Sequence, residues 1–157
     1  MRSLVRVALV AASTAALGGC LELNYSTKDK LVNMARQYGD DVRWNRVESA
    51  ALTVGADRRK LFIEQHRALE DDLEFADFEL LDLEVAPDKK KATSRADYVW
   101  TRKREGLVQK TTTEQKWESV DGNWVMVKET RLRGAPLVLF EEPAKKKTSV
   151  PASTTPF

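Results

Sequence analysis

The sequence predicts an α+β domain, in which N-terminal helices pack on one face of a bent, four- to five-stranded antiparallel sheet with a cone-like shape. Apolar residues recur at helical spacing between residues 31 and 69, and from Leu73 onward the spacing changes to that of strands. The dipeptide Asp121-Gly122 between two alternating segments is a hairpin signal, which places consecutive strands side by side. Helices that precede a run of strands are typical of the α+β class.

Length and composition place the chain among globular proteins without a metal centre. Its 157 residues, 42% of them hydrophobic and 8% aromatic, suffice for one core and exclude a wholly disordered chain. A single cysteine, Cys20, excludes an intramolecular disulfide and a thiolate zinc cluster. A single histidine, His66, argues against a histidine-rich metal site and a Ser-His-Asp triad. We therefore predict neither a metal nor a cofactor.

The first helix is predicted to begin after Ser26. This residue is placed as the N-cap, with Asp29 three residues on, as in a capping box. Gly39 follows the last apolar residue of the helical pattern and is expected to end the helix. The domain is accordingly taken as residues 26–140.

Two more short helices are predicted before the strands begin. Asp40 or Asp41 would cap the second, and Asp57 would open the third, which runs through residue 69. On the third helix either Gln65 or His66 is expected on the buried stripe, and His66 is interpreted as a partly exposed structural residue at the edge of that face. The buried stripe of the second helix is expected to comprise Trp44, Val47, Ala51 and Val54.

Four strands are predicted over residues 73–85, 92–103, 107–120 and 124–131. The apolar parity changes within the first, which indicates bulges that bend it. With two-residue turns at Glu105-Gly106 and Asp121-Gly122, Tyr98 would oppose Thr113 and Trp117 would oppose Met126. One face of the sheet is then apolar and the other charged. Residues 135–140 are expected to form either a last strand or an apolar strap, and residues 141–157, rich in Pro, Ser, Thr and Lys, a disordered tail.

The N-terminal segment is predicted to be an export signal. Arg2 and Arg6 precede an uncharged stretch over residues 7–19, which is shorter than the roughly 20 residues of a membrane-spanning helix. Leu17-Gly18-Gly19-Cys20 resembles the lipobox of bacterial lipoproteins. The resemblance implies removal of residues 1–19, acylation of Cys20 and a short lipidated tether over residues 20–25. Because Leu21 rather than Asp follows the cysteine, it further implies an outer-membrane location facing the periplasm.

The charge distribution argues against a nucleic-acid partner. The chain carries 26 Lys and Arg against 24 Asp and Glu, and both arginines of the signal segment would be removed, which leaves the side-chain charges balanced. The basic runs at 89–91 and 102–104 fall at predicted turns, and the run at 145–147 falls in the tail.

The arrangement of the strands resembles a known superfamily. Helices followed by a bent sheet with a Trp117-x3-Asp121-Gly122-x-Trp124 hairpin look like the cone fold of nuclear transport factor and ketosteroid isomerase. A cystatin-like or generic helix-on-sheet fold is the alternative. In isomerase-type members an acidic base and tyrosine donors line the cone, which makes Tyr98 and Asp77 the residues to consider here. No motif matches, so no catalytic residue is assigned.

Sequence alone leaves open whether the aromatic face is a ligand pocket or solid core. The leading prediction is a non-catalytic, lipid-anchored binding or interaction module of the cell envelope. It would be held at the membrane through Cys20, with an envelope protein or a hydrophobic small molecule as its partner. The alternatives are a small isomerase- or dehydratase-like enzyme and an envelope-assembly accessory protein that uses residues 135–140. The candidate pocket residues are Phe75, Tyr98, Trp100, Trp117, Trp124 and Met126.

Overall fold

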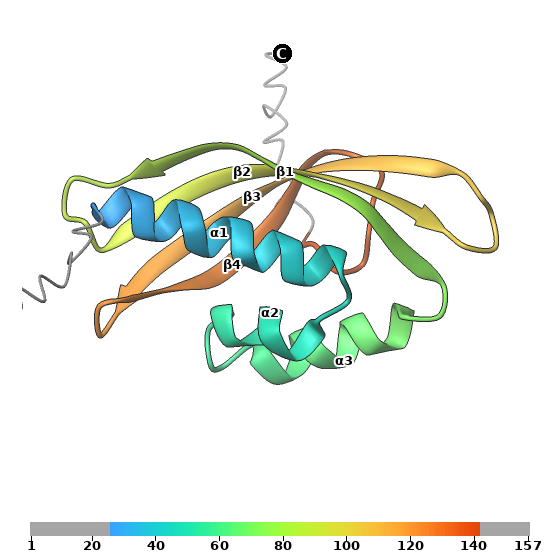
Figure 1. Ribbon diagram of the computed structural model, residues 1–157, viewed down its shortest axis with the longest axis horizontal. Helices are drawn as coiled ribbons and strands as arrows, with labels where there is room; N and C mark the ends of the chain where they lie inside the picture. The colour runs from blue at the N-terminus through green and yellow to red at the C-terminus, as the bar shows by residue number, and fades with distance from the viewer. Residues whose placement is uncertain (1–25, 142–157) are drawn as a thin grey trace, which may run out of the picture.

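Three helices cover one face of a four-stranded antiparallel sheet in the computed structural model, which describes residues 26–141 (Figure 1). The strand order is β1-β2-β3-β4, so each strand pairs with the next one along the chain. The predicted α+β class is confirmed. The signal segment, Cys20, the tether and residues 142–157 lie outside the described residues. The elements are α1 (Thr27–Arg43), α2 (Val47–Thr53), α3 (Arg59–Leu69), β1 (Leu73–Val85), β2 (Lys91–Arg102), β3 (Val108–Val120) and β4 (Asn123–Gly134).

Helix α1 begins as predicted and ends later than predicted. Ser26 and Asp29 form the capping box, with the Asp29 amide donating to the Ser26 hydroxyl at 3.1 Å. The prediction that Gly39 ends the helix is wrong, since α1 continues to Arg43. Gly39 serves close packing instead, because a Cβ atom there would lie 2.1 Å from the Phe78 ring on β1. The glycine lets β1 approach the helix.

We expect Gly39→Ala to destabilise the domain by about 1–3 kcal/mol through this clash. In an open helix the same change would stabilise by about 1 kcal/mol, so the sign of the effect tests the packing. Urea denaturation measures it. With Phe78→Ala as background, Gly39→Ala should become neutral or favourable; an equal penalty in both backgrounds would contradict this role of the ring.

Helix α2 starts later than predicted, and the predicted caps have other roles. Its N-cap is Arg46, without a side-chain cap. Asp41 is buried near the end of α1, where it accepts hydrogen bonds from Arg46 Nε at 2.7 Å and Gln37 Nε2 at 3.1 Å. Trp44 is 63% exposed, contrary to its predicted place on a buried stripe, because it lies in the connection after α1 rather than on a helix. The third helix likewise opens at Arg59 rather than Asp57.

The sheet confirms the predicted faces and corrects one register. β1 has irregularities after Phe75 and after Leu80, as its change of parity indicated. The β3–β4 pairing places Trp117 opposite Met126, as predicted. Between β2 and β3, however, Tyr98 opposes Thr111, because the pairing is centred between Arg104 and Glu105, one residue earlier than the assumed two-residue turn. A shift of two residues leaves every side chain on its predicted face.

After β4 the chain forms a strap, defined here as residues 135–141, that crosses back toward the helices. The chain turns at Gly134, whose φ is +86° and where a Cβ atom would lie 2.2 Å from the Lys110 carbonyl oxygen. Leu137 and Phe140 of the strap are buried. Glu141, predicted to belong to the tail, instead forms a parallel β-bridge with Thr130. The strap thus joins the core of the domain.

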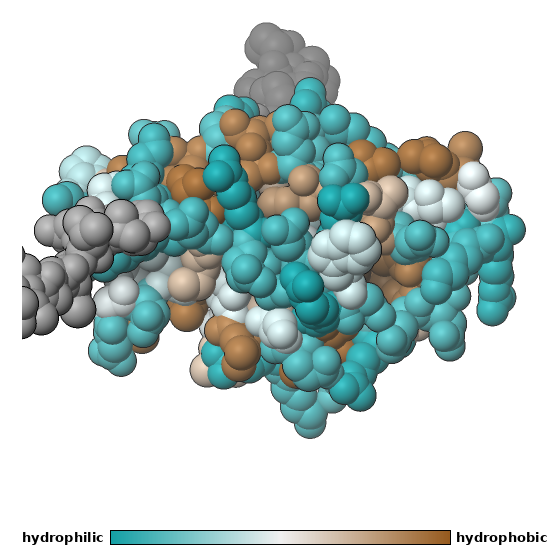
Figure 2. Space-filling view, in the orientation of Figure 1, coloured by the Kyte–Doolittle hydropathy of each residue, from teal (hydrophilic) through white to brown (hydrophobic). Residues whose placement is uncertain are grey.

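The surface of the described residues is mainly polar. Figure 2 shows hydrophilic side chains over the helices, with smaller separate apolar areas. The exposed large apolar residues are spread over helices, strands and the strap rather than confined to one element. Within residues 26–141, no helix has both the length and the apolar character needed to cross a bilayer.

Candidate functional site

A buried carboxyl group lies at the centre of the space between helices and sheet. Glu129 of β4 is 7% exposed. Its Oε2 accepts a hydrogen bond from the Tyr38 hydroxyl of α1 at 2.9 Å. Its Oε1 accepts from the Tyr98 hydroxyl at 2.9 Å, the Thr113 hydroxyl at 2.8 Å and Gln115 Nε2 at 3.0 Å. One side chain therefore links α1 with all three of β2, β3 and β4.

The hydrogen bonds continue along the inner face of the sheet. Gln115 Oε1 accepts from the Ser94 hydroxyl at 2.8 Å, and Ser94 in turn accepts from the indole N–H of Trp117 at 2.8 Å. Gln115 Nε2 also donates to the Tyr98 hydroxyl at 3.1 Å. Among the described residues no buried side-chain nitrogen or oxygen atom lacks a partner. A fully satisfied network of this kind fixes the orientation of its members.

Burial controls the titration of the three acidic groups in this cluster. Removal from water raises the pKa of the Glu129 carboxyl above its ordinary value, although the hydrogen bonds from Gln115, Thr113 and the tyrosines act in the opposite direction. Burial, followed by the nearby Glu129 charge, raises the pKa of the Tyr38 and Tyr98 hydroxyls well above the ordinary tyrosine value. Both phenols therefore remain hydrogen-bond donors at neutral pH.

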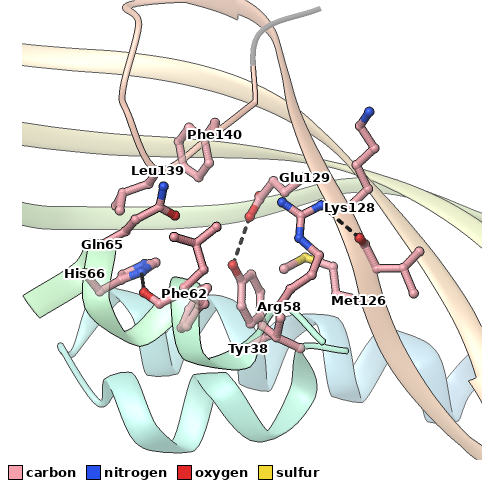
Figure 3. Close-up of a pocket in the computed structure, with 13 residues that line it drawn as sticks. Tyr38, Arg58, Phe62, Gln65, His66, Met126, Lys128, Glu129, Leu139 and Phe140 are labelled. Carbon is pink, nitrogen blue, oxygen red and sulfur yellow. Dashed lines mark hydrogen bonds between the residues drawn. The ribbon is translucent and has the colours of Figure 1, made fainter. Parts of the chain in front are cut away.

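Glu129 borders a small hollow between α3, β4 and the strap (Figure 3). Its volume is about 40 Å³, which holds water but not a metabolite. Phe62, His66 and Phe140 are among its lining residues. A second hollow of about 210 Å³, toward the start of β1, is also lined by His66 and by Leu139 of the strap. His66 of α3 and Leu139 of the strap line both hollows and therefore lie between them.

Of the two alternatives Gln65 and His66, it is His66 that is buried, more deeply than a partly exposed edge residue, because α3 turns this face toward the strap and sheet. Its Nδ1 lies 2.9 Å from the Phe62 carbonyl oxygen, and the two rings stack at 3.9 Å between centroids. A carbonyl oxygen only accepts, so Nδ1 carries the proton of the neutral ring. Burial lowers the pKa of His66 to about 4.

This depressed pKa predicts a loss of stability on acidification. Between pH 6.5 and about 4 the unfolded chain binds a proton at His66 and the folded chain does not, so about 3 kcal/mol of stability is lost over that window and is fully present above it. His66→Asn retains a donor near the Nδ1 position and does not titrate. We expect its unfolding free energy, from denaturant titrations at pH 7 to 4, to fall less steeply than that of the wild type. Parallel curves would refute the assignment.

The predicted pocket residues lie in different environments. Tyr98, Trp100 and Trp117 are fully buried in the core. Trp117 meets the Tyr38 ring edge-on at 6.3 Å between centroids. The indole N–H of Trp100 donates to the Thr111 hydroxyl at 2.9 Å. These three are held by core packing and by hydrogen bonds.

The other three candidates lie at the walls of hollows. Met126 lines the small hollow beside Glu129, and Phe75 lines the second one. Trp124 borders an open groove between α1 and the β3–β4 turn, although its own side chain is buried. Cys20, the predicted lipidation site, lies outside the described residues.

The residues considered for catalysis do not come together. Asp77 lies at the β1 bulge, where its carboxylate is largely exposed and pairs with Arg43 at 3.4 Å. Tyr98 is buried and donates to Glu129 instead. Within the described part of the chain, no group of three or more His, Cys, Asp or Glu residues is arranged to hold a metal ion.

Glu129 is the central residue that the sequence-based prediction missed. Simple alternation from Trp124 and Met126 points residue 129 to the outer face, but an irregularity opposite the Lys116–Trp117 step leaves Val127 unpaired and reverses the parity. A signal was available on the neighbouring strand. Thr111, Thr113 and Gln115 share the inner face with Trp117, and polar groups on a buried face require a polar partner.

We expect Glu129→Leu to destabilise the domain by about 3 kcal/mol or more, because it leaves several buried donors without an acceptor at about 1–3 kcal/mol each. Thermal and urea unfolding measure the effect. Glu118→Leu on the exposed face of β3 is the matched control and should change stability by no more than about 0.5 kcal/mol. Equal effects of the two substitutions would show that the network adds little.

Solved structures share this architecture. An NTF2-like protein from Cytophaga hutchinsonii aligns with a TM-score of 0.56 at 12% identity, over 68% of this chain and 98% of its own. An NTF-2 like protein of unknown function from Shewanella oneidensis aligns at 0.55 and 9%, over 68% and 98%. A ketosteroid isomerase-like protein from Erwinia carotovora atroseptica aligns at 0.55 and 13%, over 66% and 95%. The chain has this cone fold.

The cone fold confirms the resemblance inferred from the Trp117 to Trp124 hairpin. No protein-family model matches the sequence, and no curated protein is similar enough to count as a relative. Identities this low establish a common fold only, and the same fold supports many functions. Any statement about function must therefore rest on the residues of this chain.

Proposed function

We propose that this protein is a lipid-anchored binding module of the cell envelope and that its cone does not carry out catalysis. The single observation in favour of a non-catalytic role is the state of Glu129. Both of its oxygens accept hydrogen bonds from protein donors, and the hollow beside it is about 40 Å³. A general base needs a reacting group within hydrogen-bond reach, and this geometry offers no room for one.

The proposed anchor rests on the lipobox-like sequence Leu17-Gly18-Gly19-Cys20. Two or more acyl chains on one cysteine would hold a protein stably at a bilayer, whereas a single chain binds only marginally. Helix α1 begins only a few residues later, at Thr27. Residues 20–25, fully extended, span at most roughly 20 Å, so the cone would stay close to the membrane surface.

Cys20→Ala tests the anchor in cells that process lipoproteins. We expect the variant to accumulate as unprocessed precursor and to lose incorporation of labelled palmitate, because the thiol that accepts the lipid is absent. Palmitate labelling, the mass of the N-terminal peptide and membrane fractionation measure the outcome.

Ser13→Ala is the matched control, since it changes the uncharged stretch of the same segment and leaves the motif Leu17-Gly18-Gly19-Cys20 intact. It should be processed and labelled like the wild type. Wild-type palmitate labelling in the Cys20→Ala chain would exclude lipidation at this residue.

A further inference from the structure

We propose that the second hollow, beside His66, is a binding site for a small uncharged molecule that has a single flat ring and one O–H or N–H donor. His66 Nε2 accepts a hydrogen bond from that donor, and the apolar wall of the hollow contacts the ring. The inference rests on the proposed function as a binding module and names the class of its ligand.

One nitrogen of the His66 ring has a partner and the other has none. Nδ1 donates to the Phe62 carbonyl oxygen at 2.9 Å, along a dashed line in Figure 3. Within residues 26–141 no group bonds to Nε2, which carries a lone pair in the neutral ring. The side chain is only 8% exposed, and burial lowers its pKa to about 4, so the ring stays neutral at physiological pH. Nε2 is therefore an acceptor for which the chain supplies no donor.

The free nitrogen faces the second hollow. Every fully enclosed polar side-chain atom in the interior of the described residues has a hydrogen-bond partner, so Nε2 borders open space. The two nitrogens of an imidazole point away from each other, and Nδ1 points back along α3 to Phe62. Nε2 is thus directed toward the following turn of the helix. Leu69 and Glu70 of that turn line the second hollow and not the first.

The second hollow has the size and the wall for a single ring. Its volume is about 210 Å³, and an apolar cavity of roughly 150 Å³ is enough to bind benzene. Its apolar lining comes from α3, the start of β1 and the strap, and includes Leu69, Leu73, Phe75 and Leu139. Ligand sites in proteins typically combine such a wall with a few placed polar groups. Here His66 supplies the placed acceptor.

The charged side chains of the lining favour an uncharged ligand. Arg43 and Lys103 are balanced by Glu70 and Glu74. Arg43 pairs with Asp77 at 3.4 Å, and Lys103 Nζ donates to the Glu70 carbonyl oxygen at 3.0 Å, so both cations have partners in the protein. A carboxylate would bring only acceptors to the Nε2 lone pair, whereas a hydroxyl or an N–H group brings a donor.

The test observes the acceptor directly, because His66 is the only histidine of the chain. The full chain is labelled with ¹⁵N, purified in detergent without a histidine tag, and titrated with phenol at neutral pH. Free ligand concentrations are corrected for partition into the micelles. We expect phenol to move the imidazole Nε2 resonance saturably to lower frequency, because its hydroxyl donates to that nitrogen, and to leave Nδ1 nearly unchanged. Anisole has a similar ring but no donor, and should move Nε2 at least five-fold less.

Variants locate the site. Leu69→Trp places a larger side chain in the hollow and should weaken phenol binding at least ten-fold. Leu52→Trp is the matched control, because Leu52 is 71% exposed on α2, and it should bind like the wild type. His66→Asn lacks an acceptor at the Nε2 position. In equilibrium dialysis it should lose phenol affinity several-fold and keep its anisole affinity, a difference that a purely structural role of His66 would not produce.

The outcomes separate this site from the anchor. An Nε2 resonance that phenol leaves in place, or moves no more than anisole does, would overturn the proposal. Undiminished phenol binding to a folded Leu69→Trp chain would do the same. Neither result alters palmitate labelling at Cys20. The Cys20→Ala chain should bind phenol like the wild type, so loss of the anchor with retained binding would refute the anchor alone.

Discussion

The interior of this domain depends on one carboxyl group. Glu129 connects Tyr38 on α1 with Tyr98 on β2 and with Thr113 and Gln115 on β3, so helix and sheet have one relative position that satisfies every donor. Apolar contacts alone would tolerate small sliding of the helix over the sheet. A buried polar cluster tolerates much less, because each displaced donor loses its partner in a medium that offers no substitute. The cluster therefore specifies the packing as well as contributing to stability.

The fold could largely be predicted from the sequence because its signals are local. The inward position of Glu129, the centre of the site, could not be predicted. Strand alternation and the Asp121-Gly122 turn predict the β3–β4 register from the turn as far as Trp117 and Met126, and a two-residue error between β2 and β3 leaves the faces unchanged. Gly39 has the sequence context of a helix end, and only the approach of Phe78 from a distant strand explains its place within α1. Glu129 faces inward through one unpaired residue on β4, which alternation cannot reveal.

The strap fills part of the space that the helices and the sheet enclose. Helices and sheet follow an architecture shared with proteins of different described classes, from NTF2-like to ketosteroid isomerase-like. In this chain the strap fills part of the space between helices and sheet. Phe140 stacks on Tyr98, and the hydroxyl of that tyrosine is committed to Glu129. The fold therefore supplies a cavity that the C-terminal part of the domain closes.

The bulges of β1 limit the pairing of its exposed edge with other molecules. β1 and β4 are the outer strands. Among residues 26–141, β4 is bridged by Val54 and Glu141, whereas β1 pairs only with β2. A straight outer strand of this length would offer a regular row of amides and carbonyls to another molecule. Two register breaks interrupt that row, and acidic side chains repel an identical neighbour. The register breaks, together with the acidic residues Glu74, Glu79 and Glu84, thereby disfavour edge-to-edge aggregation of the domain.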